Sequence, residues 1–377
     1  MTSRLQLDGI QALRGLAAGL VLVEHTVNAI STRYLGIAPI DSPLSIFPFP
    51  VGVDIFFVIS GFIIAYSSRS LYGQPGAWRQ FALRRSARVV PLYWLTTSFM
   101  IVAFIAIGSR AWSDASWWSV AASYLFLPAA NAEGLVYPIL TVGWTLNYEM
   151  AFYVLFAMAL VFTERVALSV VVGLLVLLAV LGALAQPVAL APRFWTSPII
   201  LEFAAGIGLY WLYRTGNLSL PSGARSFLAI AAVSCLALAT ADPGAWRWLV
   251  WGGPATLLVA AALGTGTVHG AMATGIRRAG DWSYGIYLAH VPIAMIGAMA
   301  CQVLLPQTNW VWFGLFPVYV VVTSLAVAAL LHRWVERPLM DRARNSFPAK
   351  EAIKAETGAG APKRLARDEL GAAQAES

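Results

Sequence analysis

Long apolar runs separated by short polar segments set the pattern of this chain. Ten windows of helix length are apolar: 10–30, 51–68, 89–108, 141–162, 166–185, 197–213, 226–241, 246–264, 283–304 and 311–333. A helix crosses the hydrocarbon core of a bilayer with about 20 residues. A shorter run at 117–127 ends before Pro128 and is too short to cross, so it is predicted to be interfacial or re-entrant. The pattern predicts an all-α polytopic membrane protein, a bundle of about ten transmembrane helices.

Composition supports the membrane class. Of the 377 residues, 59% are hydrophobic and 11% are charged, whereas a soluble domain carries about 25% charged residues. The net charge of +7 is then a signal of topology, and no nucleic-acid partner is expected. The histidines are scattered and no Cys/His spacing is typical of a metal site, so no metal is expected.

The basic residues predict the orientation. The segment between the second and third windows contains Arg69, Arg79, Arg84, Arg85 and Arg88, which the positive-inside rule assigns to the cytoplasm. With ten spans both termini are then cytoplasmic, and most remaining arginines lie on the same side. Residues 1–343 are predicted to form the transmembrane domain. Residues 344–377 have no apolar period and are predicted to be a disordered cytoplasmic tail.

Two ionisable side chains, which are energetically unfavourable in hydrocarbon, lie within the first apolar window. Arg14 and His25 are eleven residues apart, so on a helix they share one face and are separated by about 16 Å along the axis. Ionisable groups within a transmembrane helix are energetically unfavourable and usually have a function. The plainer alternative is an Arg that snorkels to the surface and a His bonded to a neighbouring helix.

Depths estimated along the predicted spans place further polar groups at similar levels in the membrane. His25 is predicted about 8 Å below the outer surface and Glu149 about 12 Å below it, an arrangement typical of a general base and its orienting carboxylate. Asp54 is predicted near the outer rim. The alternative for Glu149 is an interhelical hydrogen bond, made as a protonated acid. His290 is predicted nearer the cytoplasm, where it lines a ligand channel or bonds a neighbouring helix.

Arginines also gather on the inner side. Arg84, Arg85 and Arg88 come just before the third window, and with Arg14 they suit a polyanion, since guanidinium groups bind phosphates in a fork. Topology and attraction to anionic lipid explain part of this cluster, but not Arg14. A ligand with phosphates at one end and a reactive group at the other, such as a coenzyme A thioester, fits a basic inner mouth and an outer His/carboxylate site.

Five segments resemble the membrane-bound acyltransferase-3 family. They are LDGIQALRG at 7–15 (followed by His25), GVDIFFVISGF at 52–62, RRSARVVPLYW at 84–94, SYGIYLAH at 283–290 and VERP at 335–338. Each motif alone is weak, but the five occur in the order typical of the family. The segment WTLNYE at 144–149 is most similar to members that modify exopolysaccharide of the succinoglycan type. Many members have a second acidic residue where this chain has Met150.

The resemblance implies acyl transfer, usually of acetyl, from cytoplasmic acyl-CoA. The acceptor would be a hydroxyl of a polysaccharide or lipid-linked oligosaccharide at the outer face of the bacterial inner membrane. The Arg and His of the opening motif correspond to Arg14 and His25.

The predicted roles follow from the resemblance and the depths together. His25 is expected to act as general base or to carry the acetyl group, with Glu149 orienting it and Asp54 nearer the acceptor. The phosphates of acetyl-CoA are expected to bind Arg14, Arg84, Arg85 and Arg88. A transporter or flippase for an anionic or sugar-lipid substrate is the alternative, because it would also need intramembrane charges.

Overall fold

Helices form at every predicted window. The computed structural model describes residues 8–32, 36, 47–109, 112, 114–131, 134–218, 220–239, 243–263, 270–304 and 311–346, and this part of the chain is helical without strands. The helices at the ten windows are α1 (Asp8–Ile30), α2 (Val51–Ser67), α3 (Ala77–Ala106), α6 (Trp144–Ala159), α7 (Glu164–Ala185), α9 (Leu201–Arg214), α10 (Ser222–Ala237), α12 (Gly252–Leu263), α13 (Gly270–Leu304) and α14 (Val311–Leu331).

Short helical segments connect these elements. They are α5 (Trp117–Leu125), α8 (Leu190–Trp195), α11 (Arg247–Val250) and α15 (Arg337–Asn345), the 3₁₀ turns η4 (Thr141–Gly143), η5 (Pro198–Ile200) and η6 (Gly244–Trp246), and a π-helical turn, η7 (His332–Glu336). With 9 residues, α5 is only about 13 Å long. The prediction that the run at 117–127 does not form a full span is therefore confirmed.

Four helical stretches of the described chain are long and apolar enough to cross a membrane: Ala77–Ala106, Glu164–Ala185, Thr274–Cys301 and Phe313–Asn345. The all-helical membrane class is thus supported, whereas the number of ten spans stays a prediction. Of the predicted tail at 344–377, residues 344 and 345 end α15, and residues 347–377 lie outside the described residues, so its predicted disorder stays untested.

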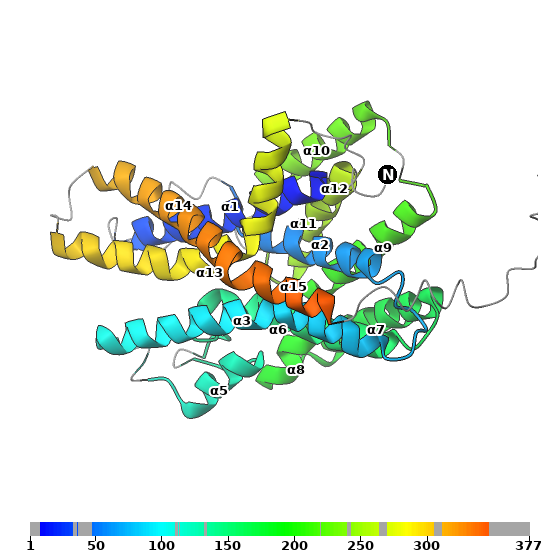
Figure 1. Ribbon diagram of the computed structural model, residues 1–377, viewed down its shortest axis with the longest axis horizontal. Coiled ribbons are helices and arrows are strands. Elements are labelled where there is room, and N and C mark those ends of the chain that lie inside the picture. Colours follow the sequence, from blue (N-terminus) through cyan, green and yellow to red (C-terminus); the bar gives the residue numbers. More distant parts are fainter. Residues whose placement is uncertain are drawn as a thin grey trace, which may run out of the picture.

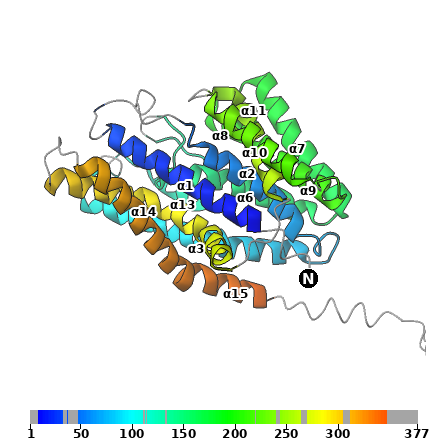
Figure 2. The same cartoon turned by 90° about the horizontal axis from the view of Figure 1, so that it is seen from above.

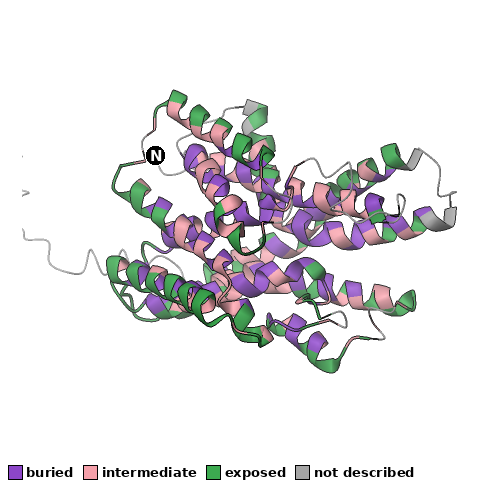
Figure 3. Ribbon diagram, turned by 180° about the vertical axis from the view of Figure 1, so that it is seen from behind, coloured by how far each residue is buried: buried purple, intermediate pink, exposed green. Residues whose placement is uncertain are grey.

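Figures 1 and 2 show how the helices pack. α1 lies along α13, with α14 beside them, while α3, α6 and α7 form the other side of the bundle. Buried residues gather where the helices meet, and the outer faces are exposed (Figure 3). Many of these exposed side chains are large and apolar, such as Val161, Leu177 and Val322. An apolar outer surface is what a helix bundle presents to lipid.

Glycines allow α2 and α9 to cross closely. A Cβ atom on Gly206 would lie 2.1 Å from the carbonyl oxygen of Val58, and one on Gly61 would lie 2.2 Å from that of Phe203. Only residues without a side chain permit such an approach, as is common between membrane helices. This contact fixes the middle of α2, where Ser60 faces the site described below.

α1 and α13 run in the same direction. Asp8 pairs with Arg277 at 2.8 Å near the start of both helices, and His25 meets His290 further along both. In a chain with ten successive spans, the first and the ninth cross the membrane in the same direction. The parallel α1 and α13 agree with this prediction.

One end of the bundle collects the basic segments. There the end of α2 meets the start of α3, the start of α7 meets the end of α9 through Glu164 and Arg214, and α15 packs on α3. The N–H of Gly73, between α2 and α3, donates to the carbonyl of Leu160 before α7 at 2.9 Å. We call this the basic end. Its assignment to the cytoplasm stays a prediction.

Candidate active site

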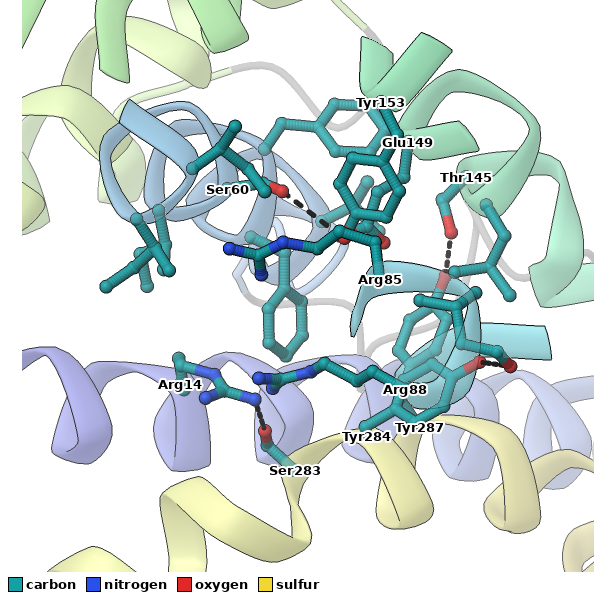
Figure 4. A pocket seen from close by; sticks show the side chains of 18 residues that line it. Arg14, Ser60, Arg85, Arg88, Thr145, Glu149, Tyr153, Ser283, Tyr284 and Tyr287 are labelled. Carbon is teal, nitrogen blue, oxygen red and sulfur yellow. Dashed lines mark hydrogen bonds between the residues drawn. The ribbon is translucent and has the colours of Figure 1, made fainter. Parts of the chain in front are cut away.

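A cavity lies between the two sides of the bundle at the level of Arg14. It encloses about 780 Å³ of space not occupied by protein atoms, its open mouth included. Its walls come from α1, α2, α3, α6 and α13 (Figure 4). The lining residues are Arg14, Val53, Phe56, Phe57, Ile59, Ser60, Ile63, Ile64, Arg85, Arg88, Val89, Thr145, Leu146, Glu149, Tyr153, Ser283, Tyr284 and Tyr287.

Three guanidinium groups converge on this cavity (Figure 4). Arg14 donates to Ser283 Oγ at 3.0 Å and to Gln11 Oε1 at 3.2 Å. Arg85 donates to Ser67 Oγ at 2.5 Å and lies over the ring of Tyr153. Arg88 has no hydrogen-bond acceptor among the described residues and faces the open space. Like charges held together away from water are unfavourable unless an anion joins them.

Glu149 is the one acidic residue in the lining. Its Oε1 accepts hydrogen bonds from Ser60 at 3.1 Å and from Tyr153. Glu149 therefore sits among the arginines, and one carboxylate faces three cations. The cavity carries an excess of positive charge.

The structure does not bring Glu149 to His25, and in this the sequence-based expectation needs correction. Glu149 accepts from Ser60 and Tyr153, whereas His25 bonds the carbonyl of Val21 and meets the ring of His290. The predicted depth of Glu149 assumes that the first residues of its window lie at the membrane surface. Those residues are buried instead: Leu140 is fully buried, and the carbonyl of Val142 accepts from Tyr287 at 3.0 Å. α6 thus starts inside the bundle and carries Glu149 deeper.

Arg84 does not line the cavity, unlike the other three predicted phosphate ligands. Its Nε atom is buried without a hydrogen-bond partner in the described chain. Arg14, Arg85 and Arg88 remain the residues that could hold an anionic ligand. For a metal, no group of three His, Cys, Asp or Glu side chains comes together among the described residues.

His25 lies further along α1, on the same face as Arg14. Both side chains contact α13, Arg14 through Ser283 and His25 through His290, which confirms the prediction that they share one face. The Nδ1 atom of His25 lies 2.9 Å from the carbonyl oxygen of Val21. Because a carbonyl only accepts, this bond places the proton on Nδ1 and leaves a lone pair on Nε2. His25 is thus in the tautomer that a base or nucleophile requires.

His290 lies beside His25 and not toward the basic end. The ring centroids are 4.8 Å apart and the planes are at 77°. The predicted depth of His290 takes residue 283 as the edge of the span. α13 starts instead at Gly270, so His290 lies about 30 Å from the start of its helix. Tyr287, which lines the cavity, has its ring centroid 6.1 Å from that of His290. This tyrosine connects the arginine cavity to the histidine pair.

Asp54 is fully buried and paired. Both its carboxylate oxygens accept from Arg247, at 3.0 and 2.8 Å, and the guanidinium lies over the ring of Trp251 at 4.7 Å. Asp54 does not line the cavity. We infer that this pair joins α2 to α11, while the expected part of Asp54 in acyl transfer stays a prediction.

The pair predicts a large effect on stability. Arg247→Gln leaves a buried carboxylate without its cation, so we expect the free energy of unfolding to fall by about 3 kcal/mol. The measurement is thermal unfolding in detergent. The matched control is Arg193→Gln, because Arg193 is an exposed arginine and its loss should leave the unfolding temperature unchanged. The double variant Asp54→Asn/Arg247→Gln should recover part of the loss. Equal unfolding temperatures for Arg247→Gln and the control would contradict the inference.

Three residues of the motif SYGIYLAH at 283–290 belong to the site, although the sequence assigned them no role in it. Ser283, Tyr284 and Tyr287 line the cavity, and Tyr287 shares a hydrogen bond of 2.7 Å with Thr145. A signal existed: positions 283, 287 and 290 follow the i, i+4, i+7 spacing of one helix face. Polar residues at this spacing in an apolar helix predict a functional face.

Comparison with known proteins assigns the family. The sequence model described as "Acyltransferase domain" matches residues 7–332. The chain therefore belongs to this acyltransferase family, the acyltransferase-3 family, in agreement with the resemblance of its motifs. With its apolar helices, this makes it a membrane protein of the acyltransferase class.

Curated relatives cover most of the chain. One is the "Exopolysaccharide production protein ExoZ" of Rhizobium meliloti (strain 1021), 34% identical over 305 residues, which are 78% of this chain and 90% of the relative. Another is the "Acyltransferase MdmB" of Streptomyces mycarofaciens, 24% identical over 89% of this chain and 92% of the relative. The "Peptidoglycan O-acetyltransferase OatA" of Listeria monocytogenes is 25% identical over 77% of this chain and 51% of the relative. No solved structure matches the chain.

Proposed function

We propose that this protein transfers an acyl group, acetyl above all, from cytoplasmic acyl-CoA to a polysaccharide hydroxyl. The acceptor is an extracellular or lipid-linked polysaccharide at the outer face of the bacterial inner membrane. The convergence of Arg14, Arg85 and Arg88 on one cavity supports this most directly. Guanidinium groups gathered inside a membrane protein suit the phosphates of such a donor. The names of two relatives, an exopolysaccharide production protein and a peptidoglycan O-acetyltransferase, favour a glycan acceptor.

The reaction needs a base at the acceptor. Nε2 of His25 accepts the proton of the acceptor hydroxyl while the hydroxyl oxygen forms a bond to the thioester carbonyl carbon. The carbon–sulfur bond then breaks, and the thiolate takes the proton from His25. Alternatively, His25 accepts the acetyl group first and passes it on. The separation of Arg14 and His25, about 16 Å on one helix, is comparable to an extended pantetheine arm.

The decisive experiment uses the purified protein in proteoliposomes with acetyl-CoA. Release of free CoA thiol that increases with added exopolysaccharide, together with labelled acetyl on the polymer, is the expected result. Movement of a labelled sugar-lipid across the bilayer without CoA release would instead establish the transporter alternative. In cells, deletion of the gene should lower the acetyl content of the glycan.

Sidedness can be tested by cysteine labelling. Gln74 lies at the basic end and is exposed, and Val188, just past the other end of α7, is 96% exposed. In a protein with Cys235 and Cys301 replaced by alanine, we expect an impermeant maleimide on intact spheroplasts to label Val188→Cys and not Gln74→Cys. Permeabilised cells are the control, in which both should react. Labelling of Gln74→Cys from outside would overturn the orientation and the cytoplasmic donor with it.

A further inference from the structure

His290 has an atom for which the fold provides no partner. The residue is fully buried, and its Nε2 makes no hydrogen bond in the described part of the chain. Its Nδ1 lies 3.0 Å from the carbonyl oxygen of Ile286 and donates to it, so the free Nε2 carries a lone pair. Buried acceptors of this kind are rare in folded proteins and call for an explanation.

His25 repeats the same arrangement on the neighbouring helix. Its Nδ1 donates to the carbonyl of Val21, and the two rings meet edge to face with their centroids 4.8 Å apart. Each of the two imidazoles thus has a free lone pair on Nε2, and α1 and α13 hold two proton acceptors side by side. A single donated proton could serve both.

We propose that His290 is a positioning residue that acts through His25, an inference that rests on the proposed function. Nε2 of His25 takes the proton of the acceptor hydroxyl, and once that oxygen has bonded to the thioester carbon, the Nε2–H of the imidazolium is free to donate a hydrogen bond to Nε2 of His290. The electrons of the broken O–H bond stay on the hydroxyl oxygen, which attacks the thioester carbon. The proton later returns from His25 to the thiolate sulfur, and His290 ends unchanged. A hydrogen-bonded pair stabilises a cation that His25 alone would hold in apolar surroundings.

A purely structural role makes a different prediction. In that case His290 only fills buried space and donates a hydrogen bond to the carbonyl of Ile286. An asparagine can make the same bond, because its side-chain amide nitrogen takes the position of Nδ1. The test therefore compares His290→Asn, which lacks an atom at the Nε2 position, with His290→Gln, which has one. Both variants are checked first for their amount in the membrane and their unfolding temperature.

The expected result is a selective loss of turnover. We expect His290→Asn to lower kcat for glycan-dependent CoA release about 100-fold with an unchanged KM for acetyl-CoA, and His290→Gln to recover a large part of kcat. If the Asn variant does not reach the membrane, His290→Phe, which fills the space without a nitrogen, replaces it. Wild-type activity in the Asn or Phe variant overturns this inference alone. Absence of CoA release by the wild-type protein overturns the proposed function, and the inference with it.

Discussion

Replacing His25 by alanine will lower acetylation of the glycan at least about 100-fold. The variant loses the Nε2 lone pair, which the bond from Nδ1 to Val21 leaves available. General-base catalysis contributes about 10²–10⁴-fold to a rate, so kcat for CoA release should fall by at least the lower value. The measurement is thiol release by purified protein, with the acetyl content of the polymer in cells carrying only this variant.

The neighbouring residue provides the control for this prediction. Glu24 adjoins His25 but points about 100° away on the helix, and it accepts from Asn28 at 3.0 Å. Glu24→Gln should therefore keep both the fold of α1 and the activity. Normal acetylation by a His25→Ala protein that inserts and folds would rule out the mechanism. Labelled acetyl trapped on wild-type protein without acceptor, and absent from the alanine variant, would identify an acetyl-histidine intermediate.

The apolar runs predicted the helices, and helix periodicity predicted the shared face of α1. Each apolar window forms a helix, and a helix satisfies the hydrogen bonds of its own backbone, as an apolar environment requires. The eleven-residue spacing of Arg14 and His25 put both against α13, since helix geometry alone determines which residues share a face. These inferences need only local structure, which the sequence contains.

Depth was predicted less well, and the reason is tertiary. Counting from the edge of an apolar window assumes that the edge lies at the surface. For Glu149 the edge is folded into the bundle, and for His290 the helix starts 13 residues before the window at 283, at residue 270. The ion pair of Asp54 with Arg247 joins residues 193 positions apart. No local pattern predicts such a pairing or the complete burial of Asp54, while its depth near the outer rim stays a prediction.

Replacing Arg88 by glutamine will weaken binding of acetyl-CoA more than turnover. Arg88 faces the cavity without an acceptor among the described residues, so its donors are free for a phosphate. Loss of a hydrogen bond to a charged group costs about 1.5–3 kcal/mol, or about 10–150-fold in affinity. We expect KM for acetyl-CoA to rise within this range while kcat at saturation changes little, because the phosphates lie far from the reacting carbonyl.

Arg84 offers a matched control four residues away on α3. It carries the same charge at the same end of the helix but does not line the cavity. Arg84→Gln should leave KM for acetyl-CoA unchanged, and any effect of the basic end on lipid binding or orientation should be shared by both variants. Equal effects of the two substitutions would mean that the arginines act through topology or lipid alone. A rise confined to Arg88→Gln would instead identify the cavity as the donor site, because only that variant changes its lining.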